Sequence, residues 1–351
     1  MRIAIVNDSP MAIEALRRVI TQVPDYQIAW IAQDGEQAVR SCANDTPDIL
    51  LMDLMMPRMD GVEATRRIMQ NSPCAILVVT ATVGGHSSKV FEAMGWGALD
   101  AVNTPVFDGS GESHSPELLA KIAVLRKLIG KPREKIRSLR QPETPSRTAE
   151  AGFPLVAIGA STGGPSALAR LLSDLPPTLR AAIVIVQHVD KVFAPGLASW
   201  LGRESSREVR VIGSGDAPNE SVVQMASTND HLLLTPDLTF TYSHEPANYS
   251  YRPSVDIFFQ TVATWWPATA VGVLLTGMGA DGAKGLLAMR RAGWHTIAQD
   301  QATSVVYGMP KAAAKLNAAA EILPIDQIAP AITRIIERPL VHKQNSKRRN
   351  V

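Results

Sequence analysis

Residues 156–165 read VAIGASTGGP, an apolar run that passes directly into a cluster of glycines with Ser161 at the junction. The segment fits G-x-S-x-G, with Gly159 and Gly163 flanking the serine, and a sharp turn from a strand into a helix requires small neighbours of this kind. A phosphate-binding loop would instead read G-x-G-x-x-G or carry Lys-Ser/Thr after its glycines, and the segment has neither. It therefore predicts a strand that delivers Ser161, as a nucleophile, to the start of a helix.

Two further apolar runs in the same half of the chain end in residues that can activate a serine. AAIVIVQH ends at His188, and AVGVLLTGMGAD reaches Asp281 after a short glycine loop. Apolar runs of strand length alternate here with amphipathic stretches, which is typical of a parallel sheet covered by helices, and functional residues gather beyond the carboxyl ends of such strands. An attacking serine, a histidine that takes its proton and a carboxylate that orients the imidazole are the parts of a serine hydrolase.

The carboxylate position has a competitor. Asp300 also follows an apolar run, HTIAQ, and can orient the imidazole in place of Asp281, whereas Asp256 is interpreted as a helix cap. The chain order serine, histidine, acid differs from the order serine, acid, histidine of α/β-hydrolases, so that fold is disfavoured. Backbone amides at the start of the helix GPSALARLL and in the GMGADG loop are the predicted donors to an oxyanion.

The N-terminal half is organised in the same way around carboxylates. RIAIV is followed by Asn7 and Asp8, DILLM by Asp53, and AILVV by Thr80. Mg²⁺ prefers oxygen ligands and keeps several waters, so Asp8 and Asp53 with a backbone carbonyl suffice to bind it when a phosphoryl group completes the shell. Asp53 is then the predicted phosphoryl acceptor. The alternative, that both aspartates only cap helices or turns, is favoured for either one alone but not for the two together.

Length and composition predict two domains. The chain has 351 residues, 46% of them hydrophobic, and a single core rarely grows beyond about 250–300 residues. The stretch KPREKIRSLRQPETPSRTAE, rich in proline and charge, is typical of a linker. The predicted division is an N-terminal domain over 1–130, a linker over 131–152, a C-terminal domain over 153–335 and a basic tail over 336–351.

Charge, hydropathy and cysteine content limit which classes of partner and which cell compartment the sequence predicts. A formal net charge of +2 lacks the basic field that nucleic-acid binding usually requires, so no nucleic-acid partner is predicted. No apolar stretch approaches the roughly 20 residues of a membrane span, and the first apolar run is too short for a signal peptide, so we expect a cytoplasmic chain without membrane insertion. Cys42 and Cys74, the only cysteines, exclude a dense disulfide framework and are expected to be buried, inert thiols.

About 125 residues of the N-terminal half resemble a two-component receiver domain, through IVNDSP, LMDLMMPRMDGVEA, VVTA and ALDAVNTP. The resemblance implies a flavodoxin-like, doubly wound parallel sheet in which Asp53 accepts phosphate from a histidine kinase, Asp8 binds Mg²⁺ and Thr80 contacts the phosphoryl group. Two positions depart from the receiver pattern: Asn7 stands where a second acidic residue is usual, and Thr104 where a lysine is usual. We therefore expect phosphorylation with altered metal dependence or switching strength.

Residues 153 to about 330 resemble the catalytic domain of the CheB family of chemotaxis-type protein-glutamate methylesterases, through IGASTGGP, VIVQHV, YRPSVDIFF, AVGVLLTGMGADGAKGL and TIAQDQATSVVYGMP. The resemblance implies a second doubly wound α/β domain whose triad is Ser161, His188 and Asp281. The family hydrolyses glutamate γ-methyl esters on methyl-accepting chemotaxis-type receptors and deamidates certain receptor glutamines through the same acyl-enzyme. No cofactor is therefore expected for hydrolysis.

The same resemblance assigns residues to the substrate-binding or oxyanion region and suggests how the site is regulated. Thr162, Gly163 and Met278 stand beside the triad, and Arg252 either binds a receptor carboxylate or forms a structural ion pair. An unphosphorylated receiver is expected to cover the Ser161 cleft, and phosphorylation to loosen that contact. The apolar MMPRMDG surface is either a core edge or an interface with the second domain.

Finer details of the sequence point to a subgroup and leave two other function classes to be weighed. IVNDSP, DAVNTP, QHVD and YRPSVD look most like Wsp-type surface-sensing pathways, which adjust cyclic-di-GMP signalling instead of swimming. One rival is a non-catalytic adaptor that binds receptors and competes for kinase phosphate. A response-regulator transcription factor is disfavoured, because about 180 residues of α/β sequence are far too many for a helix-turn-helix module.

Overall fold

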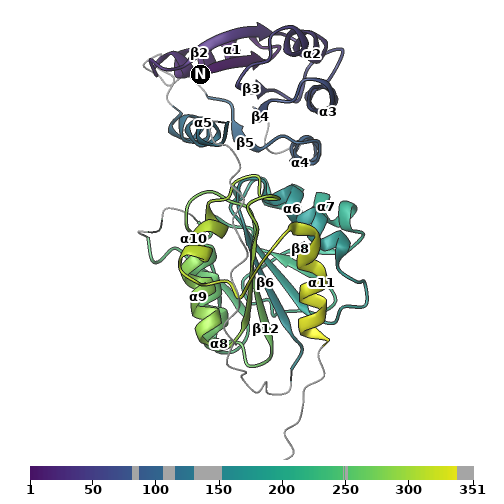
Figure 1. The fold of residues 1–351 in the computed structure, drawn as a ribbon, viewed down its shortest axis with the longest axis vertical. Coiled ribbons are helices and arrows are strands. Elements are labelled where there is room, and N and C mark those ends of the chain that lie inside the picture. The colour runs from purple at the N-terminus through teal and green to yellow at the C-terminus, as the bar shows by residue number, and fades with distance from the viewer. Residues whose placement is uncertain (81–86, 106–114, 130–151, 248, 250–251, 338–351) are drawn as a thin grey trace, which may run out of the picture.

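The computed structural model describes residues 1–80, 87–105, 115–129, 152–247, 249 and 252–337. Within these residues the chain forms two α/β domains built on parallel sheets, as predicted, and the N-terminal domain sits on one end of the C-terminal domain (Figure 1). The predicted linker and tail fall almost entirely outside the described residues, so their limits stay predictions.

The described N-terminal domain is a doubly wound sheet with strand order β2-β1-β3-β4-β5, the order of flavodoxin-like folds. Its strands are β1 (Arg2–Val6), β2 (Gln27–Ala32), β3 (Ile49–Met52), β4 (Ala75–Thr80) and β5 (Asp100–Asn103), and its helices are α1 (Pro10–Thr21), α2 (Gly35–Asn44), α3 (Gly61–Asn71), α4 (Ser87–Gly95) and α5 (Pro116–Ile129). Side chains alternate along each strand, so Ile3 and Ile5 pack toward α1 and α5 while Ala4 and Val6 pack toward α2, α3 and α4.

The described C-terminal domain has a longer parallel sheet, in the order β14-β13-β12-β6-β7-β9-β8, and a separate antiparallel pair, β10 and β11. The strands are β6 (Leu155–Ala160), β7 (Ala182–Gln187), β8 (Val209–Val211), β9 (Val223–Met225), β10 (His231–Leu234), β11 (Phe240–Ser243), β12 (Ala270–Leu274), β13 (His295–Gln299) and β14 (Glu321–Leu323). The helices are α6 (Gly164–Asp174), α7 (Ala194–Ser205), α8 (Val255–Trp265), α9 (Ala283–Arg291), α10 (Met309–Lys315) and α11 (Ile325–Ile336). Core residues of α6, α7 and α11 lie on one face of the sheet, and those of α8, α9 and α10 on the other.

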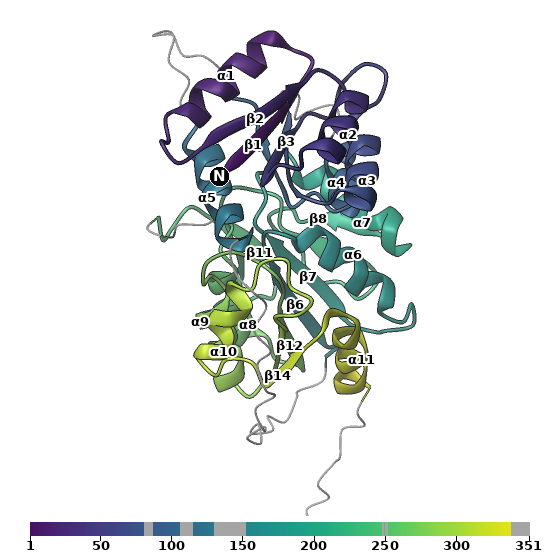
Figure 2. The ribbon, with the colours of Figure 1, turned by 45° about the horizontal axis from the view of Figure 1, so that its top comes forward.

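The two domains share a hydrophobic core through α4. This helix packs against α6 and α7, as Figures 1 and 2 both show. The buried rings of Phe91 and Trp200 lie 6.2 Å apart across the boundary, and the Ser166 hydroxyl donates a hydrogen bond of 2.9 Å to the carbonyl of Met94. The MMPRMDG segment was expected to be either a core edge or an interface with the second domain. Its Met59 is buried in the core of the N-terminal domain, which agrees with the first alternative at that residue.

The described residues bear on two predictions, one about membrane-spanning segments and one about the two cysteines. None of their helices combines the length and the apolar composition that crossing a membrane requires. Cys42 is buried, as predicted, whereas Cys74 is only half-buried because it lies just before β4, and neither forms a disulfide.

Candidate active site

The turn after β6 places Ser161 between the sheet and α6, as the sequence predicted. Gly163 has a φ of 76°, and a Cβ added there would lie 2.5 Å from the Cβ of Val305. A Cβ on Gly277 would lie 2.7 Å from the Cβ of Ser161 itself. Both glycines are therefore required by close approach, and Gly163 also by a backbone conformation that other residues rarely adopt.

Two buried polar side chains fix this turn to its neighbours. The amide of Ser161 donates to the carbonyl of Thr276 (3.0 Å), and the Thr276 hydroxyl donates to the carbonyl of Thr162 (3.0 Å). On the other side, the Gln187 side-chain amide donates to the carbonyls of Ser161 (2.9 Å) and His188 (3.1 Å). The Gln187 side chain thus links the backbone of Ser161 to that of His188.

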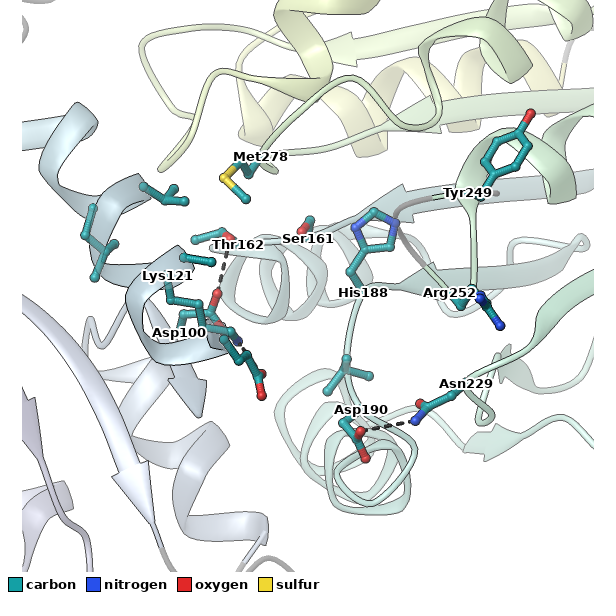
Figure 3. A pocket seen from close by; sticks show the side chains of 15 residues that line it. Asp100, Lys121, Ser161, Thr162, His188, Asp190, Asn229, Tyr249, Arg252 and Met278 are labelled. Carbon is teal, nitrogen blue, oxygen red and sulfur yellow. Dashed lines mark hydrogen bonds and ion pairs between the residues drawn. The ribbon is translucent and has the colours of Figure 1, made fainter. Parts of the chain in front are cut away.

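His188 and Asp281 come together as the sequence predicted. Nε2 of His188 lies 2.8 Å from Oδ2 of Asp281, and the two side chains are 9% and 5% exposed. Figure 3 shows the imidazole of His188 beside Ser161, both facing the same pocket. The imidazole therefore pairs with the Asp281 carboxylate and lines the same pocket as Ser161.

The Asp281 carboxylate rests on the N-terminus of α8. Oδ1 accepts hydrogen bonds from the Ser254 hydroxyl (2.7 Å) and the Asp256 amide (3.1 Å), and Oδ2 accepts one from the Val255 amide (2.7 Å). Burial alone would raise the pKa of Asp281, but hydrogen bonds from His188, Ser254 and Val255 outweigh it and hold that pKa below its usual value. The helix terminus thus keeps a buried carboxylate ionised.

The two other aspartates considered from sequence have separate tasks. Asp300 accepts hydrogen bonds from the amide (2.9 Å) and hydroxyl (2.6 Å) of Thr303, so it closes a turn, while the imidazole pairs with Asp281. Asp256 accepts a hydrogen bond of 2.7 Å from the Gly285 amide. Its interpretation as a helix cap is confirmed, but the helix that it caps is α9, not its own.

The pocket in front of Ser161 has a volume of about 670 Å³ and is walled by both domains. The Thr162 hydroxyl donates a hydrogen bond of 3.2 Å to Oδ2 of Asp100, the first residue of β5, and Lys121 Nζ lies 2.8 Å from Oδ1 of the same carboxylate (Figure 3). The charged and polar wall residues are Asp100, Glu117, Lys121, Ser161, Thr162, His188, Asp190, Asn229 and Arg252, with Met278 and Tyr249 beside them.

Arg252 is half-buried and lines the pocket. Its Nη1 lies 2.9 Å from the ring nitrogens of His244, and its Nη2 donates to the carbonyl of Ala247 at 3.2 Å. Among the described residues Arg252 forms no ion pair with a carboxylate, so the structural ion pair considered from sequence is not found there.

The residues predicted for phosphorylation meet at the carboxyl edge of the N-terminal sheet. Asp53 directly follows β3, is nearly buried, and accepts a hydrogen bond of 2.7 Å from the Leu54 amide. Burial, with the charge of nearby Asp8, raises the pKa of Asp53 to about 6. Thr80 is buried at the end of β4, and its carbonyl accepts a hydrogen bond of 3.0 Å from the Thr104 amide.

Several residues that shape the site were missed from the sequence. Ser254, which holds Asp281, carries only a helix N-cap signal, and Gln187 is marked only by its place before His188. Asp100 and Lys121 belong to the other domain, and nothing in their neighbourhood along the chain indicates a contact with Thr162. These contacts arise from packing between segments that are distant in the sequence.

Comparisons with known proteins agree with this architecture. The family model CheB methylesterase matches residues 156–332, and the model Response regulator receiver domain matches residues 3–109. A Pseudomonas aeruginosa protein named protein-glutamate methylesterase/protein-glutamine glutaminase 3 is 52% identical over 338 residues, which cover 96% of this chain and 100% of the relative. A protein of the same name from Burkholderia orbicola is 55% identical over 335 residues, covering 95% and 97%.

Solved structures give the same result for the C-terminal domain. The crystal structure of the Thermotoga maritima CheB methylesterase catalytic domain is 32% identical, covers 53% of this chain and 100% of its own, and superposes with a TM-score of 0.50. With the fold, the site and these matches together, the chain belongs to the CheB methylesterase family and carries a response regulator receiver domain ahead of the catalytic domain.

Proposed function

We propose that this chain is a phosphorylation-regulated serine hydrolase that demethylates glutamate γ-methyl esters on chemoreceptor-type proteins and deamidates receptor glutamines. The observation that carries the proposal is the His188–Asp281 hydrogen bond of 2.8 Å beside Ser161, in a pocket of about 670 Å³. Relatives at 52–55% identity that are named for these two activities support it. A non-catalytic adaptor would have no use for an ionised carboxylate held behind an imidazole.

The residues imply an acyl-enzyme mechanism. Ser161 Oγ attacks the side-chain carbonyl carbon of the substrate while Nδ1 of His188 takes the hydroxyl proton, since Nε2 is bonded to Asp281. Thr162 and Met278 line the same pocket, and their backbone amides are the donors that we propose for the oxyanion. His188 then gives its proton to the departing methanol or ammonia. Water attacks the remaining ester by the same route, which releases glutamate and restores the serine.

At the receiver, Asp8 and Asp53 fit a hard divalent cation. The raised pKa of Asp53, about 6, reflects a buried carboxylate next to a second negative charge, and a cation relieves both effects. The described residues hold no cluster of three or more His, Cys, Asp or Glu side chains, so Mg²⁺ held by these two aspartates would take its other oxygens from water, backbone and phosphate. Asp8 and Asp53 would hold the cation, which when bound would supply positive charge to the phosphoryl group that Asp53 accepts from a histidine kinase.

Methanol release from a methylated receptor, with and without a small-molecule phosphodonor, tests this function. For the full chain, the phosphodonor should raise the rate about 5- to 150-fold, the usual range of coupling between two sites. Asp53→Asn should keep the unstimulated rate and lose the rise. Asp25→Asn, which changes an exposed carboxylate in the same domain, should respond like the wild type. A rise that survives Asp53→Asn would contradict the assignment of Asp53.

The second part of the proposal is that the receiver inhibits the active site. We propose that it does so through the contact of Asp100 with Thr162. The carboxylate of Asp100 accepts the hydrogen bond of the Thr162 hydroxyl next to Ser161, and Lys121 holds it there. Asp100 begins β5, whereas Asp53 and Thr80 lie at the opposite edge of the same parallel sheet. Phosphorylation would therefore act on the pocket at a distance, through α4 and β5, which carry the contacts between the domains.

Replacing Asp100 with alanine should raise the unstimulated rate of methanol release about 3- to 10-fold, because a hydrogen bond to a charged group contributes about 1.5–3 kcal/mol and Asp100 is partly exposed. Glu117→Ala removes a carboxylate from the same wall of the pocket and is expected to change the rate less than twofold. Equal effects of the two substitutions, measured on unphosphorylated full-length protein, would show that charge and not this contact matters.

We also assign the chain to a Wsp-type surface-sensing pathway, with a methyl-accepting receptor as substrate and a histidine kinase as phosphodonor. The support is the detail of IVNDSP, DAVNTP, QHVD and YRPSVD. Measuring cyclic-di-GMP and swimming in a deletion strain distinguishes this pathway from flagellar chemotaxis.

A further inference from the structure

A second histidine, His231, is completely buried behind the triad. It begins β10, which packs against α8, and its ring and that of the pocket residue Tyr249 meet in a T-shaped arrangement at a centroid distance of 5.7 Å. The mechanism above gives it no part. A buried ionisable side chain with no assigned role requires a physical explanation.

The hydrogen bonds of His231 define its tautomer. Nδ1 accepts a hydrogen bond of 3.1 Å from the Ser254 amide, so Nδ1 carries no proton. Nε2 lies 3.3 Å from the carbonyl of Pro246, which accepts hydrogen bonds only, so Nε2 carries the proton. The ring is therefore neutral, and a second proton could be added only at Nδ1, where it would face the Ser254 N–H.

The amides of Ser254, Val255, Asp256 and Ile257 at the start of α8 all have acceptors, and Asp281 of the active site supplies two of them. The Ser254 amide donates to His231, the Val255 and Asp256 amides donate to Asp281, and the Ile257 amide donates to the Ser254 hydroxyl at 3.4 Å. The first four amides of a helix lack partners within the helix itself. His231 and Asp281 thus share one helix terminus, and Ser254 contacts both of them.

We propose that His231 is a positioning residue: by accepting the Ser254 amide, its neutral ring fixes the N-terminus of α8, which in turn fixes the Asp281 carboxylate behind His188. This inference rests on the proposed function, because it extends the triad by two residues. The series runs from Ser161 through His188, Asp281 and Ser254 to His231.

The charges around His231 agree with a neutral ring. Burial lowers the pKa of His231, and the positive charge of Arg252 lowers it further, whereas the Pro246 carbonyl and the carboxylates of Asp281 and Asp230 act in the opposite direction. Burial prevails, so the ring is predominantly neutral at pH 7 and above. The acceptor at Nδ1 is then present under the conditions in which a serine hydrolase with a histidine base works.

Two substitutions of similar polarity separate the roles of the two ring nitrogens. His231→Asn places an amide oxygen near the position of Nδ1 and keeps an acceptor for Ser254. His231→Gln places its amide near the position of Nε2, so it retains a donor to Pro246 and loses the acceptor. In full-length protein, kcat for methanol release should stay within about threefold of wild type for His231→Asn and fall about 10- to 100-fold for His231→Gln, with KM changed less than twofold in both.

Thermal melts of the two variants check folding, and ¹⁵N NMR of His231 in the wild-type protein measures the tautomer directly. An unprotonated Nδ1 at neutral pH, together with loss of kcat in His231→Gln but not in His231→Asn, supports the proposal. Equal kcat in the two folded variants, or a proton on Nδ1, overturns it. If Ser161→Ala also releases methanol at the wild-type rate, the proposed function itself has failed, and this result is distinct from the first.

Discussion

Replacing Ser161 with alanine should lower kcat for methanol release by about 10⁴-fold or more, because the reaction loses its nucleophile while the pocket and the remaining contacts stay in place. The fold should be retained, since the side chain at this position is small and the amide of residue 161 would still reach the Thr276 carbonyl. Binding of methylated receptor and phosphorylation of Asp53 should also persist. Methanol release, receptor co-sedimentation and phosphotransfer measured on one preparation check all three expectations.

The matched control for this substitution is Ser173→Ala, which removes an exposed serine hydroxyl from α6. It should release methanol at the wild-type rate. If Ser161→Ala retained more than about a tenth of the wild-type rate, Ser161 would not be the nucleophile. The alternative of a non-catalytic adaptor would then be favoured.

Replacing Asp281 with asparagine should lower kcat about 10⁴-fold with a smaller change in KM, because an amide cannot hold the imidazole in the tautomer that accepts the Ser161 proton. The carboxylate of Asp281 accepts four hydrogen bonds, from Ser254, Val255, Asp256 and His188. An asparagine has one acceptor oxygen, and its NH₂ group would face other donors. We therefore also expect a loss of about 1–3 kcal/mol in the free energy of unfolding.

The Asp256→Asn variant separates the loss of folding stability from the loss of catalytic rate. This neighbouring buried carboxylate caps α9 through the Gly285 amide and does not contact His188. It should lose stability to a similar extent and keep kcat within about tenfold. In the double variant Ser161→Ala/Asp281→Asn, kcat should be close to that of Ser161→Ala alone, since triad residues act as a unit. Additive losses would mean that Asp281 acts independently of the serine.

The sequence predicted that Ser161, His188 and Asp281 lie together because each follows an apolar run, and in parallel sheets such positions meet at one edge. The same rule placed Asp8, Asp53 and Thr80 together. It did not choose between Asp281 and Asp300, because both end an apolar run; only the contacts of His188 and Thr303 separate them. Strand ends identify which residues reach the edge, but not which side chains turn toward one another.

Local sequence patterns did not predict the residues that support Asp281 or the contact between the two domains. Ser254 and His231 act through the start of α8, and a capping serine looks the same in sequence whether or not a carboxylate is bound behind it. Asp100 meets Thr162 at the boundary where α4 packs on α6 and α7, and that contact between apolar surfaces depends on three-dimensional shape. Hydrophobic periodicity specifies that a helix face is buried, not what covers it.

The most direct measurement is acid-quenched mass spectrometry of the full-length protein during single turnovers of a methylated receptor fragment. We expect a transient receptor-derived ester on the peptide that contains Ser161, formed as methanol appears and lost as free glutamate appears. Methanol release at the same rate with no adduct on that peptide, or with the adduct on another residue, would show that Ser161, activated by His188 and Asp281, is not the nucleophile.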